Sequence, residues 1–141
     1  MIHTATFTIR TFHCDSFGHV NNARHLELME EARWQFGEAI GLTTLLREAE
    51  IGFIIMDMKL RFRSPVFEGQ SIRVESSLQA LGSSSGELKQ SLWIEGEKRP
   101  AVQAVSHFLL IDRQQQNQTV SIEGAIRDCM MQVLSKADDP S

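Results

Sequence analysis

The stretch HCDSFGHVNNARHLELMEEAR, residues 13–33, joins a dense cluster of polar side chains to the start of an amphipathic segment. Before it, residues 4–11 alternate between apolar and polar, as in a half-buried strand rich in β-branched residues. After it, residues 22–40 carry apolar side chains at helical spacing. The polar cluster is therefore predicted to lie at a junction between a strand and a long helix.

The predicted helix has one apolar and one acidic face. The apolar face is expected to contain Leu26, Leu28, Met29, Ala32, Phe36, Ala39 and Ile40. Glu27, Glu31 and Glu38 fall on the opposite face, and Gly41 is expected to end the helix. At ~1.5 Å per residue these nineteen positions would span nearly 30 Å, which is long enough to cross a sheet.

A period of two returns at Gly52 and continues through four consecutive segments, at residues 52–62, 72–79, 88–95 and 101–111. The first of these is expected to have an apolar face made of Ile54, Met56, Met58, Leu60 and Phe62. Its opposite face is expected to be charged, with Asp57, Lys59, Arg61 and Arg63. The last segment is mostly apolar, which favours a central position in the sheet.

A final helix is predicted after Ser121, which we expect to be its N-cap, and the tail from Ser135 to Ser141 is expected to fray. Four consecutive strands with short turns pair antiparallel, and one long helix can pack across their sheet. The sequence therefore predicts an α+β fold, with residues 1–141 forming a single domain.

The composition limits the class of protein. Hydrophobic residues make up 42% of the 141, and the formal net charge is -4. An acidic chain of this kind is not expected to coat nucleic acid. We expect a cytoplasmic protein with no membrane insertion, because no apolar run approaches ~18 residues. Cys14 and Cys129 lack the spacing of a zinc site, so no metal and no cofactor are expected.

The junction has residue types suited to carbonyl chemistry. The first amides of a helix can stabilise an oxyanion, and a carboxylate just upstream can act as a nucleophile or as a general base. Asp15 occupies that place, with His19 as a nearby donor and Asn21 or Asn22 as a helix cap. The plainer alternatives remain open: Asp15 could cap a turn, and His19 could be a structural residue.

The segment Asp15–Arg33 resembles the signature of hotdog-fold acyl-CoA thioesterases. It is similar to the branch that includes 4-hydroxybenzoyl-CoA thioesterase and the bacterial long-chain acyl-CoA thioesterases. LRFRSP, residues 60–65, is similar to the end of a strand in that family, and the likeness extends to about Ile111. The resemblance implies a hotdog fold, in which an antiparallel sheet wraps around one long helix.

The resemblance also implies roles for individual residues. Asp15 would be the catalytic carboxylate, while His19 and Asn22 would line the substrate pocket. Other hotdog branches carry the acid in the long helix, which keeps Glu30 and Glu31 as weaker candidates.

The resemblance further implies a homodimer or homotetramer, because hotdog sheets pair edge to edge and share their active sites. Arg61 and Arg63 would then bind the phosphates of the acyl-CoA substrate, and the acyl chain would lie near Leu26, Met29 and Phe53. Two alternatives on the same fold remain open at this point. One is a hydratase or dehydratase of acyl thioesters, and the other is a non-catalytic binder of acyl thioesters.

Overall fold

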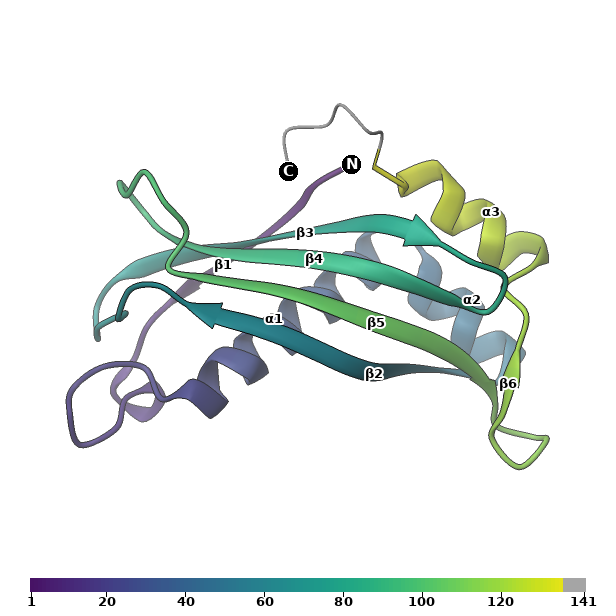
Figure 1. The fold of residues 1–141 in the computed structure, drawn as a ribbon, viewed down its shortest axis with the longest axis horizontal. Helices are drawn as coiled ribbons and strands as arrows, with labels where there is room; N and C mark the ends of the chain where they lie inside the picture. The colour runs from purple at the N-terminus through teal and green to yellow at the C-terminus, as the bar shows by residue number, and fades with distance from the viewer. Residues whose placement is uncertain (136–141) are drawn as a thin grey trace.

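The computed structural model describes residues 1–135, which form one curved antiparallel sheet and three helices. The strands are β1 (His3–Thr8), β2 (Ile51–Phe62), β3 (Ser71–Leu81), β4 (Ser85–Ile94), β5 (Val102–Asp112) and β6 (Gln118–Val120). The helices are α1 (Asn22–Ala39), α2 (Leu42–Ala49) and α3 (Gly124–Val133), and a short 3-10 helix spans Thr11–His13. The strand order is β1-β3-β4-β5-β2, with β6 paired to β5. The predicted α+β hotdog arrangement is confirmed, because the sheet curves across α1 (Figure 1).

Helix α1 buries one stripe of side chains against the concave face of the sheet. The buried residues are His25, Leu28, Met29, Ala32 and Phe36. Asn21 caps the helix through its side chain, and Gly41 follows the helix with φ +80°, as a C-terminal glycine should. The expectation for Leu26 was wrong, because this side chain is 40% exposed. One position is a rotation of ~100° on a helix, and the buried stripe is centred on His25 and Met29.

Helix α2 was not predicted from the sequence. It begins directly after Gly41 and buries Leu42 and Leu46. A helix of eight residues is too short to be stable in isolation, although most of its residues favour helix, so packing stabilises it. The contact with α1 is close: a Cβ built on Gly37 would lie 2.7 Å from Thr43 Oγ1. Any larger residue at position 37 would therefore push the two helices apart.

Strand β2 contains a bulge between Ile55 and Asp57. The predicted alternation holds after the bulge, where Met58 and Leu60 pack against the core. It was wrong before the bulge, where Ile54 and Met56 are 42% and 51% exposed. The extra residue reverses the inward and outward positions, so Phe53 and Ile55 face inward instead.

The C-terminal helix begins later than predicted. Glu123 occupies the N-cap position of α3, so the assignment of Ser121 as the cap was wrong. The chain before the helix is held by tertiary contact instead, because the Ile122 amide donates to the Ser83 carbonyl at 2.7 Å. Ser135 also donates its amide to Leu78, whereas the rest of the predicted frayed tail lies outside the described residues.

Candidate active site

Asp15 lies at the first corner of a tight turn that leads to α1. The Asp15 amide donates to the His19 carbonyl, and the Gly18 amide donates to the Asp15 carbonyl, both at 3.0 Å. Gly18 has φ +83°, a conformation that favours glycine. The Val20 amide donates to the Val66 carbonyl at 2.8 Å, which ties the turn to the loop between β2 and β3. Backbone contacts on both sides therefore fix the position of Asp15.

The Asp15 carboxylate is only partly used by the turn. Its Oδ1 accepts a hydrogen bond from the Phe17 amide at 2.9 Å and lies 3.9 Å from His19 Nδ1. Within residues 1–135, Oδ2 meets no hydrogen-bond donor, and the side chain is 27% exposed. The turn-capping role that the sequence left open is thus real, but it occupies one oxygen. The other oxygen is available to a ligand.

His19 connects the turn to the loop between β2 and β3. It forms an isolated β-bridge with Phe67, and the two rings lie edge to face with centroids 6.4 Å apart. Its ring is also stacked on Phe17 at 6.1 Å, and the side chain is 40% exposed. Asp15 and His19, predicted as neighbours, are therefore brought together on one accessible surface.

The start of α1 offers two free amide donors beside this turn. Asn21 Oδ1 accepts from the Ala23 amide at 2.8 Å, and the Asn21 carbonyl accepts from the His25 amide at 3.2 Å. In the described part of the chain, the amides of Asn22 and Arg24 have no acceptor. Asn22 is the first residue of the helix and is exposed. Asn21 is therefore the cap, which leaves the side chain of Asn22 free.

A buried histidine, which sequence reasoning missed, supports the first turn of α1. His25 is 3% exposed, and its ring lies 5.7 Å from that of Phe62 on β2. Its Nδ1 is buried without a partner. Burial, together with a smaller contribution from the nearby His19, lowers the pKa of His25 to about 4. His25 is therefore neutral at pH 7. The sequence did contain a sign of this buried residue, because His25 is a polar residue within the apolar row of the predicted helix.

The predicted basic residues lie on the other face of the sheet. Arg61 and Arg63 are exposed, and Arg63 Nε donates to Gln103 Oε1 at 2.8 Å. Arg61 pairs with Gln103 in the register between β2 and β5, one position away from the inward-facing Phe62. Within one chain, the two arginines are therefore not brought into the surface around Asp15. Glu30 and Glu31 are both exposed on α1.

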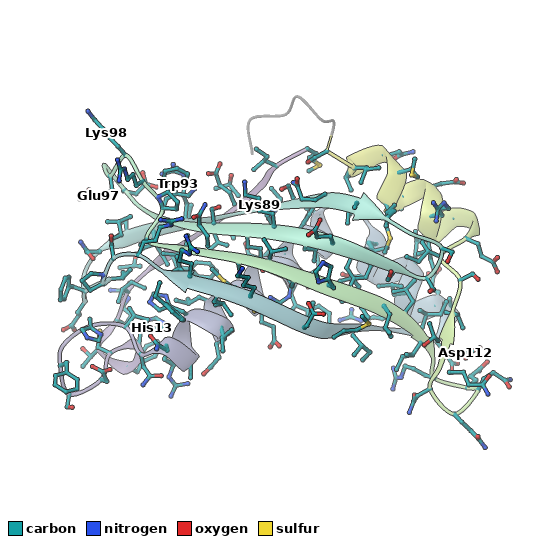
Figure 2. All side chains as sticks on the ribbon, in the orientation of Figure 1. His13, Lys89, Trp93, Glu97, Lys98 and Asp112 are labelled. Carbon is teal, nitrogen blue, oxygen red and sulfur yellow. The ribbon has the colours of Figure 1, made fainter. Side chains whose placement is uncertain are left out.

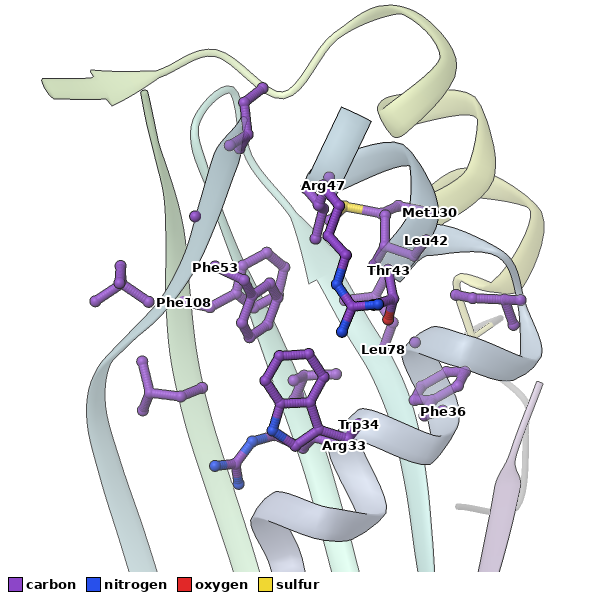
Figure 3. Close-up of a pocket in the computed structure, with 18 of the residues that line it drawn as sticks. Arg33, Trp34, Phe36, Leu42, Thr43, Arg47, Phe53, Leu78, Phe108 and Met130 are labelled. Atoms are coloured by element: carbon purple, nitrogen blue, oxygen red, sulfur yellow. The ribbon is translucent and has the colours of Figure 1, made fainter. Parts of the chain in front are cut away.

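An apolar cavity of about 490 Å³ lies at the opposite end of α1. It is bounded by α1, α2, α3 and the first half of β2, and Trp34 projects into its centre (Figure 3). Phe53 and Phe108 stack on the sheet side with ring centroids 4.4 Å apart. The cavity has the size and lining of a site for a small apolar ligand or part of one.

One charged group lines this cavity from a fixed position. Arg33 Nη1 donates to Gln90 Oε1 at 3.1 Å, and Gln90 Nε2 donates to the Met29 carbonyl at 2.9 Å and to Ser76 Oγ at 3.0 Å. Burial lowers the pKa of Arg33, and the neighbouring Glu30 opposes that shift. This network could not be predicted from sequence spacing, because it joins residues that lie far apart in the chain.

Residues 1–135 hold no group of three or more His, Cys, Asp or Glu side chains arranged to bind a metal ion. Among the same residues, no helix combines the length and apolar character needed to cross a membrane. The expected cytoplasmic location stays a prediction.

Comparisons with known proteins agree with the predicted resemblance. The model of the thioesterase-like superfamily matches residues 9–130. The long-chain acyl-CoA thioesterase FadM of Escherichia coli is 32% identical over 126 residues, which are 89% of this chain and 95% of FadM. The chain therefore belongs to the thioesterase-like superfamily, and the predicted class of enzyme, a thioester hydrolase, is confirmed.

Two solved structures support the fold. YbaW, a probable thioesterase from Escherichia coli, superposes with a TM-score of 0.84 at 30% identity, covering 94% of this chain and 98% of YbaW. SAV2348 from Staphylococcus aureus, solved in complex with CoA, has a TM-score of 0.86 at 13% identity, covering 99% of this chain and 90% of its own. The second likeness shows the fold alone.

Proposed function

We propose that this protein hydrolyses the thioester bond of acyl-CoA, giving a free acid and coenzyme A, with Asp15 as the reacting carboxylate. The observation that carries this proposal is the geometry of Asp15: a backbone-fixed carboxylate with one free oxygen, directly before the start of a long helix. The identity to a long-chain acyl-CoA thioesterase supports the choice of substrate.

This carboxylate could act in two ways, as a nucleophile or as a general base. As a nucleophile, an Asp15 oxygen attacks the thioester carbon, the C–S bond breaks, coenzyme A leaves as the thiolate, and water hydrolyses the resulting anhydride. As a general base, Asp15 takes a proton from water while the water oxygen attacks the same carbon; the C–S bond then breaks, and coenzyme A leaves as the thiol after taking that proton from Asp15. On either route, the free amides of Asn22 and Arg24 are suited to stabilise the oxyanion.

We further propose that His19 and Asn22 bind the thioester end of the substrate. Both belong to the accessible surface around Asp15, and each has donor capacity that the fold does not consume. His19 also stacks on Phe17, so an entering pantetheine arm would meet this aromatic ring.

The apolar cavity is the best candidate for the acyl chain. Phe53 lines it, in agreement with the expected acyl path, whereas Met29 is fully buried in the core and does not. Glu30 is the first residue of α1 that lines the cavity, about 12 Å along the helix from Asn22 at ~1.5 Å per residue. A single chain therefore separates the proposed carboxylate from the nearest part of the proposed acyl pocket by about two turns of the helix.

A homo-oligomer would join the two parts. Within residues 1–135, the outer edge of β2 has no strand partner, and its exposed side chains include Ile54, Met56 and Phe62. A second copy paired antiparallel across this edge would bring the Phe62 end of one strand to the Ile51 end of the other. That places the Asp15 turn of one copy beside the cavity of the other, and Arg61 and Arg63 close to a substrate shared by both copies.

The first test is thiol release across short, long and aromatic acyl-CoAs, with light scattering in parallel. We expect free thiol with at least one series and no dominant monomer at micromolar concentration. Formation of a double bond in the acyl chain without thiol would indicate a dehydratase instead. Tight binding without either product would indicate a non-catalytic binder.

The second test concerns the shared site. Asp15→Asn protein mixed and reassembled with Ile54→Trp protein should hydrolyse a long-chain acyl-CoA faster than either variant alone, because each mixed dimer contains one intact site. If Asp15 and the cavity of the same chain form the site, every mixed dimer carries a defect in both sites, and the mixture stays below the residual long-chain activity of the Ile54→Trp protein.

A further inference from the structure

A second hollow lies at the same end of the molecule as the Asp15 turn. It has a volume of about 610 Å³ and is formed by the hairpin between β4 and β5 and the loop between β2 and β3. Figure 2 shows Glu97 and Lys98 on this hairpin and His13 on the segment before the turn, all at one end, with Asp112 at the other. We call this hollow the hairpin groove.

The hairpin groove carries two cations that the fold does not use. Lys98 and Arg99 both line it and are exposed, and within residues 1–135 neither forms an ion pair or a side-chain hydrogen bond. Glu97 is the one carboxylate in the lining, so the cations are in excess. Unpaired lysine and arginine side chains beside each other are suited to phosphate oxygens.

An aromatic ring forms the wall of the groove nearest to Asp15. Phe67 is 45% exposed, and its amide is held by Gln70 Oε1 at 2.7 Å, which fixes the loop. An exposed ring on a fixed loop is a stacking platform for a planar base. The same Phe67 contacts His19, and His19 lies 3.9 Å from Asp15. The groove is therefore continuous with the surface around the proposed carboxylate.

We infer that the hairpin groove binds the nucleotide end of coenzyme A, with Phe67 against the adenine and with Lys98 and Arg99 on the phosphates. This inference rests on the proposed function and specifies its substrate recognition. It adds these contacts to the phosphate role proposed for Arg61 and Arg63. The Arg63 backbone lies beside the groove, since its amide donates to the Ala101 carbonyl at 2.7 Å, whereas its side chain lies on the outer face of the sheet and donates to Gln103.

The direct test uses adenosine 3′,5′-bisphosphate, which is the nucleotide of coenzyme A without its pantetheine arm. Calorimetric titration of the full chain should show binding, and Lys98→Gln/Arg99→Gln should weaken that binding about tenfold or more, as two partly screened contacts to phosphate would. Arg127→Gln is the matched control: it removes the same type of charge from α3 and should leave the affinity within about twofold. An unchanged affinity in the double variant would overturn the inference.

Kinetics give an independent test. With octanoyl-CoA, the double variant should raise KM about tenfold with little change in kcat, whereas S-octanoyl pantetheine, which lacks the nucleotide, should be hydrolysed as by the wild type. Equal losses on both substrates would refute the inference. A loss confined to octanoyl-acyl carrier protein would also refute it, because the hairpin would then contact a carrier protein.

The two proposals fail in different ways. If the wild type releases no thiol from any acyl-CoA but binds the bisphosphate through Lys98 and Arg99, the nucleotide site stands and the hydrolytic function falls. If thiol is released normally and the double variant behaves as the wild type in both assays, the hydrolytic function stands and the nucleotide site falls.

Discussion

The two ends of α1 differ in almost every physical property. At the start of the helix lie a partly exposed carboxylate, two histidines and free backbone amides, all held by a tight turn. At the other end lies a cavity walled by aromatic and aliphatic side chains, with Arg33 anchored by a buried glutamine. The first end is equipped for bond breaking and the second for apolar recognition. The proposed function assigns the chemistry to the first end and the selection of the acyl chain to the second.

The sharpest way to break this comparison is Asp15→Asn, which keeps the size of the side chain and the turn-capping oxygen. If the start of α1 performs the chemistry, kcat should fall by a factor of about 100 or more, because positioned acid–base groups typically contribute that much. Thermal stability should be nearly unchanged. Glu31→Gln is the control and should be almost silent; the reverse pattern would move the catalytic acid into the helix.

The second prediction concerns how far the stability of the protein depends on the buried, neutral ring of His25 at the start of α1. Its pKa of about 4 in the folded state lies below the unfolded value of 6.5, so the unfolded chain binds the proton first as the pH falls. Stability should therefore drop between pH 6.5 and 4 and level off below that range. Between pH 7.5 and 5 the wild type should lose about 2 kcal/mol more than His25→Leu in urea unfolding. Equal losses of unfolding free energy in both proteins would show that protonation of His25 does not destabilise the folded state.

Ile54→Trp tests whether the apolar end of α1 binds the acyl chain. Ile54 lines the cavity and is partly exposed, so a larger ring should obstruct the mouth with little effect on folding. Excluding two methylenes of the acyl chain should lower kcat/KM for a long-chain acyl-CoA about tenfold, at roughly 0.8 kcal/mol for each methylene. A short-chain acyl-CoA should be hydrolysed nearly as before. A uniform loss at all chain lengths would place the acyl chain elsewhere.

The smallest expected effect concerns the outer face of β2. Because Arg61 and Arg63 are exposed, Arg61→Ala or Arg63→Ala should raise KM for acyl-CoA only about threefold, within the range of screened surface charges. Activity on an acyl-pantetheine thioester should be unaffected. Losses of similar size on both substrates would mean that these arginines are structural.

Sequence reasoning performed best where a local pattern is sufficient. The long helix was predicted over residues 22–40 and observed as Asn22–Ala39, and the strand-helix-four-strand order was correct apart from α2 and the short strand β6, which were not predicted. Sequence reasoning failed where packing decides the outcome. Helix α2 has only eight residues, and it depends on burying Leu42 and Leu46. The bulge in β2 reversed the faces of Ile54 and Met56, because strand pairing, and not periodicity, decides where an extra residue is placed.

For the proposed site, the sequence by itself determined that Asp15 and His19 lie close together just before the helix that begins at Asn22, since only six positions separate Asp15 from Asn22 and one of them is a turn glycine. Only the tertiary structure decided that Arg61 and Arg63 lie behind the sheet, that His25 is buried and neutral, and that Phe67 joins the hairpin groove to His19. These relations connect segments far apart in the chain. Burial and cross-strand register arise when the sheet closes around α1, and no local spacing encodes them.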